Sequence, residues 1–204
     1  MKEKEEPGIV PEQHTGKPID AESSVELAST EEAKTFFQTV KSRLENVNGW
    51  HSLAGELSAE FQLVDEQGQE VNRPVQKGDY FKIDVPGPGT KSGEGFDWVR
   101  VEAVEAISNA NEETFAIRVR PAQNPQGDEK DVAHFYSPDS TSSFTVKREG
   151  RKITAGIYDR NTKTNKQANS LTDKIRDAVV GAAGILSFSK IQWSALADGL
   201  LRKK

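Results

Sequence analysis

The chain has 204 residues, of which 34% are hydrophobic and 29% are charged, and its formal net charge is −5. These proportions are typical of one soluble globular domain that carries a polar terminal segment. The absence of cysteine excludes disulfides, thiolate metal sites and a cysteine nucleophile. No apolar run approaches the ~18 residues of a membrane span. Because the first seven residues also lack the apolar stretch of a secretory signal, we expect a cytoplasmic protein.

Residues 1–22 contain several prolines and glycines among charged side chains and few residues that a core would bury. This composition predicts a disordered acidic tail, followed by a single domain over residues 23–204. The alternation of Val25 and Leu27 then indicates a short first strand near residues 23–28.

A helix is expected directly after this strand. Ser29 and Glu32 have the spacing of a capping box, in which each side chain binds a free backbone N–H of the first turn. Apolar residues then recur at helical spacing as far as Leu44, and Asn48-Gly49 favours a helix end. Trp50 follows on a short second helical turn.

Several later segments alternate apolar and polar residues with period two, which is the pattern of half-buried strands. They lie near residues 59–63, 81–85, 99–103, 115–119, 144–146 and 153–157. The last two are joined across Arg148–Arg151 as a hairpin. Since each strand has one polar face, the sequence predicts an antiparallel sheet with one side in water.

The segment from Ser170 to Leu201 has apolar residues at three- and four-residue steps and predicts one long helix. Gly181 and Gly184 are the positions where this helix would bend or approach the sheet most easily. The predicted fold class is α+β. It consists of a curved antiparallel sheet of six or seven strands around a long C-terminal helix, with a short helical pair after the first strand.

This order of elements resembles the START-like or SRPBCC superfamily, also called the helix-grip fold. The opening Val25-Glu-Leu-Ala-Ser-Thr-Glu-Glu-Ala-Lys-Thr-Phe36 is similar to the strand-to-helix start of that family. The resemblance implies a cavity between the long helix and the sheet, which in the family binds sterols, lipids, polyketides or hormones, while a minority of members are enzymes. The chain departs from the family pattern in its long 86–95 and 121–143 connections.

The candidate ligand-binding residues are aromatic. Those expected on the inward face of the sheet are Phe61, Phe81, Phe115 and Phe144, and those expected near the rim of a cavity are Trp98, Tyr158 and Trp193. The spacing is equally compatible with a filled core, so the sequence leaves open whether the interior is hollow.

No metal or cofactor is expected. The glycine-rich 86–95 loop departs from a phosphate loop because Thr90 stands where glycine must precede the lysine, and because a strand follows it rather than a helix. His14, His51 and His134 are not at metal-ligand spacing. Asp128, Glu129 and Asp131 lack the spacing and central glycine of a calcium loop.

A nucleic-acid partner is not expected either. The segment 147–176 carries nine basic and three acidic residues, but its single aromatic residue, Tyr158, does not provide a series of interleaved rings to stack on bases. For acid–base chemistry, the strand carboxylates Glu60, Asp84 and Glu102 fall on the polar face. Asp97 and His134 are therefore the only candidates.

Three functions remain open. The first is a carrier or sensor that encloses an apolar small molecule or lipid, with the 86–95 loop as its gate. The second is a protein-binding module with a solid core, and the third is a cyclase- or hydrolase-like enzyme that uses Asp97 or His134. The identity of the ligand and the oligomeric state are not predicted.

Overall fold

The structure is a computed structural model that describes residues 8–55, 58–85, 93–128, 131–163, 165 and 182–203. Its elements in chain order are β1 (Lys17–Glu26), α1 (Thr30–Glu45), the 3₁₀ turn η1 (Val47–Gly49), α2 (Trp50–Ala54), β2 (Glu60–Val64), β3 (Tyr80–Asp84), β4 (Asp97–Ser108), β5 (Glu112–Pro121), β6 (Thr141–Glu149), β7 (Lys152–Thr162) and α4 (Ala182–Leu200).

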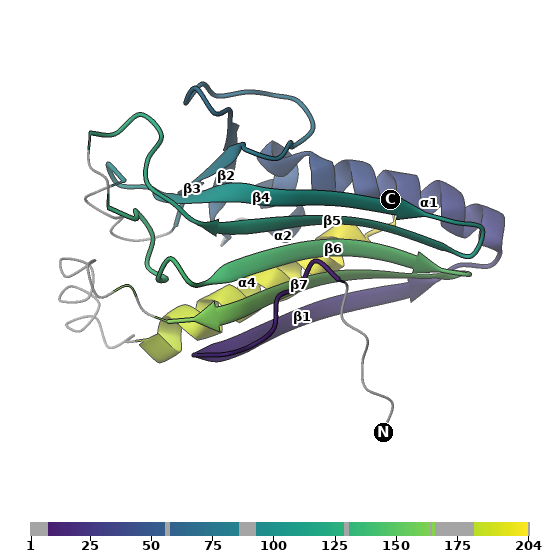
Figure 1. Ribbon diagram of the computed structural model, residues 1–204. Helices are drawn as coiled ribbons and strands as arrows, with labels where there is room; N and C mark the ends of the chain where they lie inside the picture. The colour runs from purple at the N-terminus through teal and green to yellow at the C-terminus, as the bar shows by residue number, and fades with distance from the viewer. Residues whose placement is uncertain are drawn as a thin grey trace.

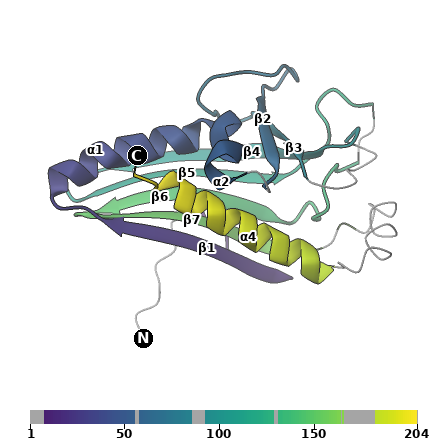
Figure 2. The ribbon, with the colours of Figure 1, turned by 180° about the vertical axis from the view of Figure 1, so that it is seen from behind.

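The strands form one seven-stranded sheet in the order β1-β7-β6-β5-β4-β3-β2, and every neighbouring pair is antiparallel. The labelled helices lie on one face of this sheet (Figures 1 and 2). Helix α4 packs on β1, β7 and α2, and α1 packs on β6. This arrangement confirms the predicted α+β helix-grip architecture, in which a curved antiparallel sheet holds a C-terminal helix.

Helix α1 begins as its capping box predicts. The hydroxyl of Ser29 accepts a hydrogen bond from the backbone N–H of Glu32 at 3.1 Å, and the Glu32 carboxylate accepts one from Ala28 N at 3.1 Å. These two bonds satisfy donors that the first turn would otherwise leave free.

The described part of the C-terminal helix is α4, Ala182–Leu200. Its predicted first turns, residues 170–181, lie outside the described residues, and so does most of the 86–95 loop that was expected to act as a gate. Among the helices that the structure describes, none is both long and apolar enough to cross a bilayer.

The N-terminal segment differs from its prediction. The first strand begins at Lys17 rather than near Ser23, and Ile9, within the expected disordered tail, is only 1% exposed. The Asn161 side chain accepts hydrogen bonds from the backbone N–H groups of His14 and Thr15 at 2.7 and 3.1 Å. The prediction failed because polar contacts hold this segment, and an apolar pattern does not reveal such contacts.

The core lies between the sheet and the helices, and its centre is an aromatic cluster. Trp50 is fully buried and donates its indole N–H to Leu44 O at 3.1 Å. Its ring lies 5.3, 5.5 and 4.6 Å from the rings of Phe61, Phe81 and Phe144. These side chains fill the middle of the grip, so any cavity must lie toward one end of it.

Candidate functional site

A small cavity lies at the end of the grip, between α4 and the sheet. Its volume is about 40 Å³. It is lined by Phe61, Phe81, Ile83, Val85, Val99, Val119, His134, Phe135, Tyr136, Ser142, Phe144, Phe188, Ser189, Gln192 and Trp193. Since a buried water needs about 10–15 Å³, this space holds about three waters. A whole lipid is far larger.

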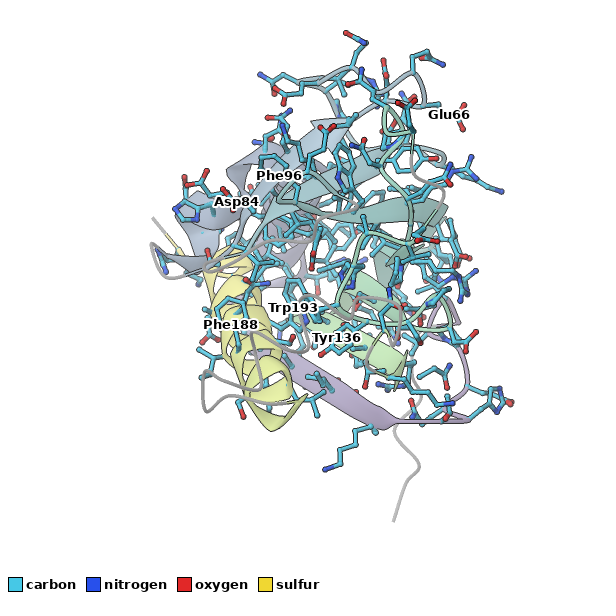
Figure 3. All side chains as sticks on the ribbon, turned by 90° about the vertical axis from the view of Figure 1, so that its left-hand side faces the viewer. Glu66, Asp84, Phe96, Tyr136, Phe188 and Trp193 are labelled. Carbon is cyan, nitrogen blue, oxygen red and sulfur yellow. The ribbon has the colours of Figure 1, made fainter. Side chains whose placement is uncertain are left out.

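The structure brings four of the seven predicted ligand-binding residues to this cavity. Phe61, Phe81 and Phe144 face it from β2, β3 and β6, and Trp193 faces it from α4. Phe188 and Trp193 of α4 lie with Tyr136 at the end of the molecule that Figure 3 turns toward the viewer. Val85, Phe135 and Phe188 are half-buried and form the mouth of the cavity.

The other three predicted residues lie elsewhere. Trp98 packs with Val64 and Ala133 in a separate cluster. Phe115 belongs to the main core, and the Lys41 ammonium group lies over its ring, 5.3 Å from the centroid of the Phe115 ring. The Tyr158 hydroxyl donates to Glu22 of β1 at 2.6 Å. None of the three lines the cavity, because alternation places Trp98 and Tyr158 on the opposite face and Phe115 lies farther along its strand.

His134 is the most unusual polar residue of the wall. It is 6% exposed, and its Nδ1 accepts a hydrogen bond from the backbone N–H of Tyr136 at 2.9 Å. Burial lowers the pKa of the imidazole to about 3, so the ring is neutral at pH 7. Because Nδ1 is an acceptor, the single proton of the neutral ring is on Nε2.

Three hydroxyls and one amide complete the polar part of the wall. The hydroxyl of Ser142 on β6 donates a hydrogen bond to Asp159. The hydroxyls of Tyr136 and Ser189 lie 3.2 Å apart and share one hydrogen bond, and burial raises the pKa of Tyr136. Gln192 accepts the backbone N–H of Ala59 through its Oε1 at 2.8 Å. Its NH₂ group therefore remains a donor in the wall.

A buried carboxyl group lies one layer behind this wall. Asp159 is 1% exposed and accepts the indole N–H of Trp193 at 2.9 Å. Burial raises the pKa of Asp159 to about 6, although Ser142 and Trp193 favour its ionised form. The pKa is raised because these two donors do not fully replace the lost hydration of the carboxylate.

Asp97 is a second buried carboxyl group near the same end. Asp97 of β4 lies opposite Ile83 of β3 in the sheet, and Ile83 lines the cavity. The backbone N–H of Phe135 donates to the Asp97 carboxyl group. Burial raises its pKa to about 7, and its Oδ2 has no hydrogen-bond partner among the described residues. Asp97 and His134, the two acid–base candidates, thus lie at one end of the cavity, although only His134 lines it.

Asp159 was not predicted as a site residue from the sequence. The inward alternation Ile153, Ala155 and Ile157 continues to residue 159, so period two alone could have found it. The contributions of Ser142 and Ser189 followed from no sequence pattern, because serine is common on solvated faces.

A larger polar groove of about 380 Å³ lies at the β2 edge of the sheet. It is lined by Asn48, His51, Ser52, Glu60, Phe61, Gln62, Glu70, Lys82, Asp84 and Phe96. Lys82 is already paired with Glu70 at 3.0 Å and lies 4.4 Å from the Phe96 ring. Among the residues that the structure describes, no three histidine or carboxylate side chains are grouped as metal ligands.

Searches against family models and curated proteins find no match to this chain. Among solved structures, the chain is similar to a hypothetical protein from Helicobacter pylori at 13% identity and a TM-score of 0.49, covering 90% of this chain and 87% of the other. It is also similar to norcoclaurine synthase from Thalictrum flavum in complex with dopamine and hydroxybenzaldehyde, at 13% identity and a TM-score of 0.36, over 88% of this chain and 85% of that one.

A third similar structure is the di-domain ARO/CYC protein BexL, at 10% identity and a TM-score of 0.40, with 92% of this chain and 51% of the other covered. Similarity at this level carries no argument about activity or ligand. The fold stands on the topology of this chain, and membership of the START-like superfamily stays a prediction.

Proposed function

We propose that this protein binds a small, largely apolar molecule at the end of the helix grip, in the cavity between α4 and the sheet. The function is that of a carrier or sensor. The ligand inserts one compact group into the cavity and leaves the rest of its body at the mouth, against Val85, Phe135 and Phe188.

One observation carries this proposal: apart from Ser142, the wall is apolar on the sheet side, and it presents a few polar groups on the other side. Val99, Val119 and the aromatic rings form the apolar part. His134, Tyr136 and Ser189 provide the polar part within a few ångströms of one another. A concave apolar surface with a few converging polar groups is the usual form of a small-molecule site.

The volume limits the size of the inserted group. About 40 Å³ admits an acetyl-sized group, whereas a buried benzene ring needs a cavity of about 150 Å³. The ligand is therefore not enclosed as a whole, unlike the lipid that the sequence analysis considered.

The test is a titration of the full-length protein with α-methylstyrene, followed by ¹H–¹³C NMR of the methyl groups. We expect shifts confined to the lining residues Ile83, Val85, Val99 and Val119. V119L places a larger side chain in the cavity and should weaken binding about tenfold or more. V146L, in a buried core position outside the cavity, is the matched control and should bind like the parent protein. Absence of saturable shifts, or equal binding by V119L, would refute the proposal.

The aromatic cluster around Trp50 favours a second candidate, a protein-binding module with a solid core. It fills the centre of the grip with side chains that would otherwise line a larger chamber. This candidate predicts no saturable binding of the hydrocarbon probe and a protein partner whose binding weakens with salt.

A further inference from the structure

We infer that the group inserted into the cavity is a neutral hydrogen-bond acceptor, such as the carbonyl oxygen of a ketone, ester or amide, which the Nε2–H of His134 binds. This inference rests on the proposed binding function and adds the chemical class of the ligand. It follows from the polarity of the wall and from the charges around it.

The imidazole ring of His134 has a fixed orientation. Tyr136 N–H occupies Nδ1, and the His134 ring stacks on Phe135 and Tyr136 with centroids 4.4 and 5.7 Å away. The ring is thus held in place, and Nε2 carries its proton. Among the described residues none accepts a hydrogen bond from Nε2, although the side chain is more than nine-tenths buried and lines the cavity. Because His134 lines the cavity, a ligand that supplies an acceptor there can take a hydrogen bond from its Nε2–H.

Side chains next to His134 supply further hydrogen-bond donors to the cavity. The Tyr136 and Ser189 hydroxyls have two protons between them and use one in their shared hydrogen bond. The other proton is available to the cavity, whichever of the two is the donor. The amide NH₂ of Gln192 adds another donor. A carbonyl oxygen with its two lone pairs fits between such groups.

The surroundings of the cavity disfavour the insertion of a charged ligand group. The described lining residues contain no lysine or arginine, so an inserted carboxylate would be desolvated without a counter-charge. The carboxyl groups of Asp97 and Asp159 also disfavour a second negative charge nearby. Neither of them lines the cavity, and Asp159 is bound to the Trp193 indole, so an inserted ammonium group would not reach a carboxylate directly.

The experiment compares probes of one shape on the full-length protein. Acetophenone and α-methylstyrene differ only by C=O in place of C=CH₂, while benzoate and 1-phenylethylamine carry an anion and a cation. Dissociation constants are measured by the same methyl NMR titration. The ratio of the acetophenone and α-methylstyrene dissociation constants is compared between the parent protein and each variant, so the different hydrophobicities of the two probes cancel.

H134F removes the Nε2–H donor together with the Nδ1 acceptor of Tyr136 N–H, and its larger ring takes up part of the cavity. Because acetophenone and α-methylstyrene have the same shape, the ratio of their dissociation constants cancels this steric effect. We expect H134F to weaken acetophenone about two- to tenfold relative to α-methylstyrene. The double variant Y136F/S189A removes both hydroxyls, and with them the proton available to the cavity. It should shift the same ratio in the same direction, and it serves as the second variant if H134F is poorly folded. In the parent protein, acetophenone should bind more tightly than benzoate and 1-phenylethylamine.

The outcomes separate the two proposals. If α-methylstyrene binds and both variants leave the ratio unchanged, the acceptor assignment is wrong while the binding function stands. Tighter binding of benzoate or of the amine also overturns the acceptor assignment. If neither acetophenone nor α-methylstyrene binds, the proposed function fails, and this inference fails with it.

Discussion

The buried carboxyl group of Asp159 should make the stability of the protein depend on pH in a defined direction. Burial raises its pKa from 3.8 to about 6. The folded protein therefore holds the proton more tightly than the unfolded chain does. The stabilisation by the protonated group is complete below pH 3.8, decreases as the pH rises toward 6, and is lost above that. This rise of the Asp159 pKa corresponds to about 3 kcal/mol of unfolding free energy.

The substitution D159N removes this dependence while it keeps an oxygen to accept the Trp193 indole N–H. We expect D159N and the parent protein to have similar stabilities at pH 4, and D159N to be about 3 kcal/mol more stable at pH 8. Urea unfolding followed by tryptophan fluorescence at both pH values measures the difference, and other titrating groups cancel between the two proteins.

The exposed Asp139 provides the control, since D139N removes a carboxylate that stays hydrated in both states. Its stability relative to the parent protein should be the same at pH 4 and pH 8. A D159N difference that does not change with pH, or that favours the parent protein at pH 8, would refute the assignment of Asp159 as a buried, costly carboxylate.

Two further predictions concern packing and polar contacts. N161A removes the hydrogen bonds that hold residues 12–15, so it should lower the free energy of unfolding by about 2–4 kcal/mol and speed proteolysis of this segment. N161G should lose the same contacts without backbone strain, because glycine adopts the positive φ of 57° easily. If both variants resist protease like the parent, Asn161 does not hold the segment. G199A places a methyl group 2.2 Å from Leu53 O and should lower the free energy of unfolding by about 1–3 kcal/mol, measured by thermal unfolding. D198A, at the exposed neighbouring position, is the control and should change stability little. Equal melting temperatures of the two variants would contradict the close approach of α4 to α2.

The local elements of this protein were determined by sequence. The Ser29–Glu32 capping box placed the start of α1, and period-two alternation placed β2 to β7, because each pattern reflects contacts among near neighbours. The order of these elements was enough to predict the helix-grip architecture. Where polar contacts replaced apolar periodicity, as at residues 8–16, prediction from pattern failed.

The site was decided by tertiary structure. Alternation placed Phe61, Phe81 and Phe144 on the inward face, but it did not show how far each lies from α4, so it grouped Phe115 with them. Whether aromatic side chains line a space or fill it depends on how closely the helix approaches the sheet, and the packing of Trp50 and Trp193 sets that distance. The free Nε2 of His134 likewise arises because the fold buries that ring and gives it one partner, and no local pattern encodes the environment that distant segments create.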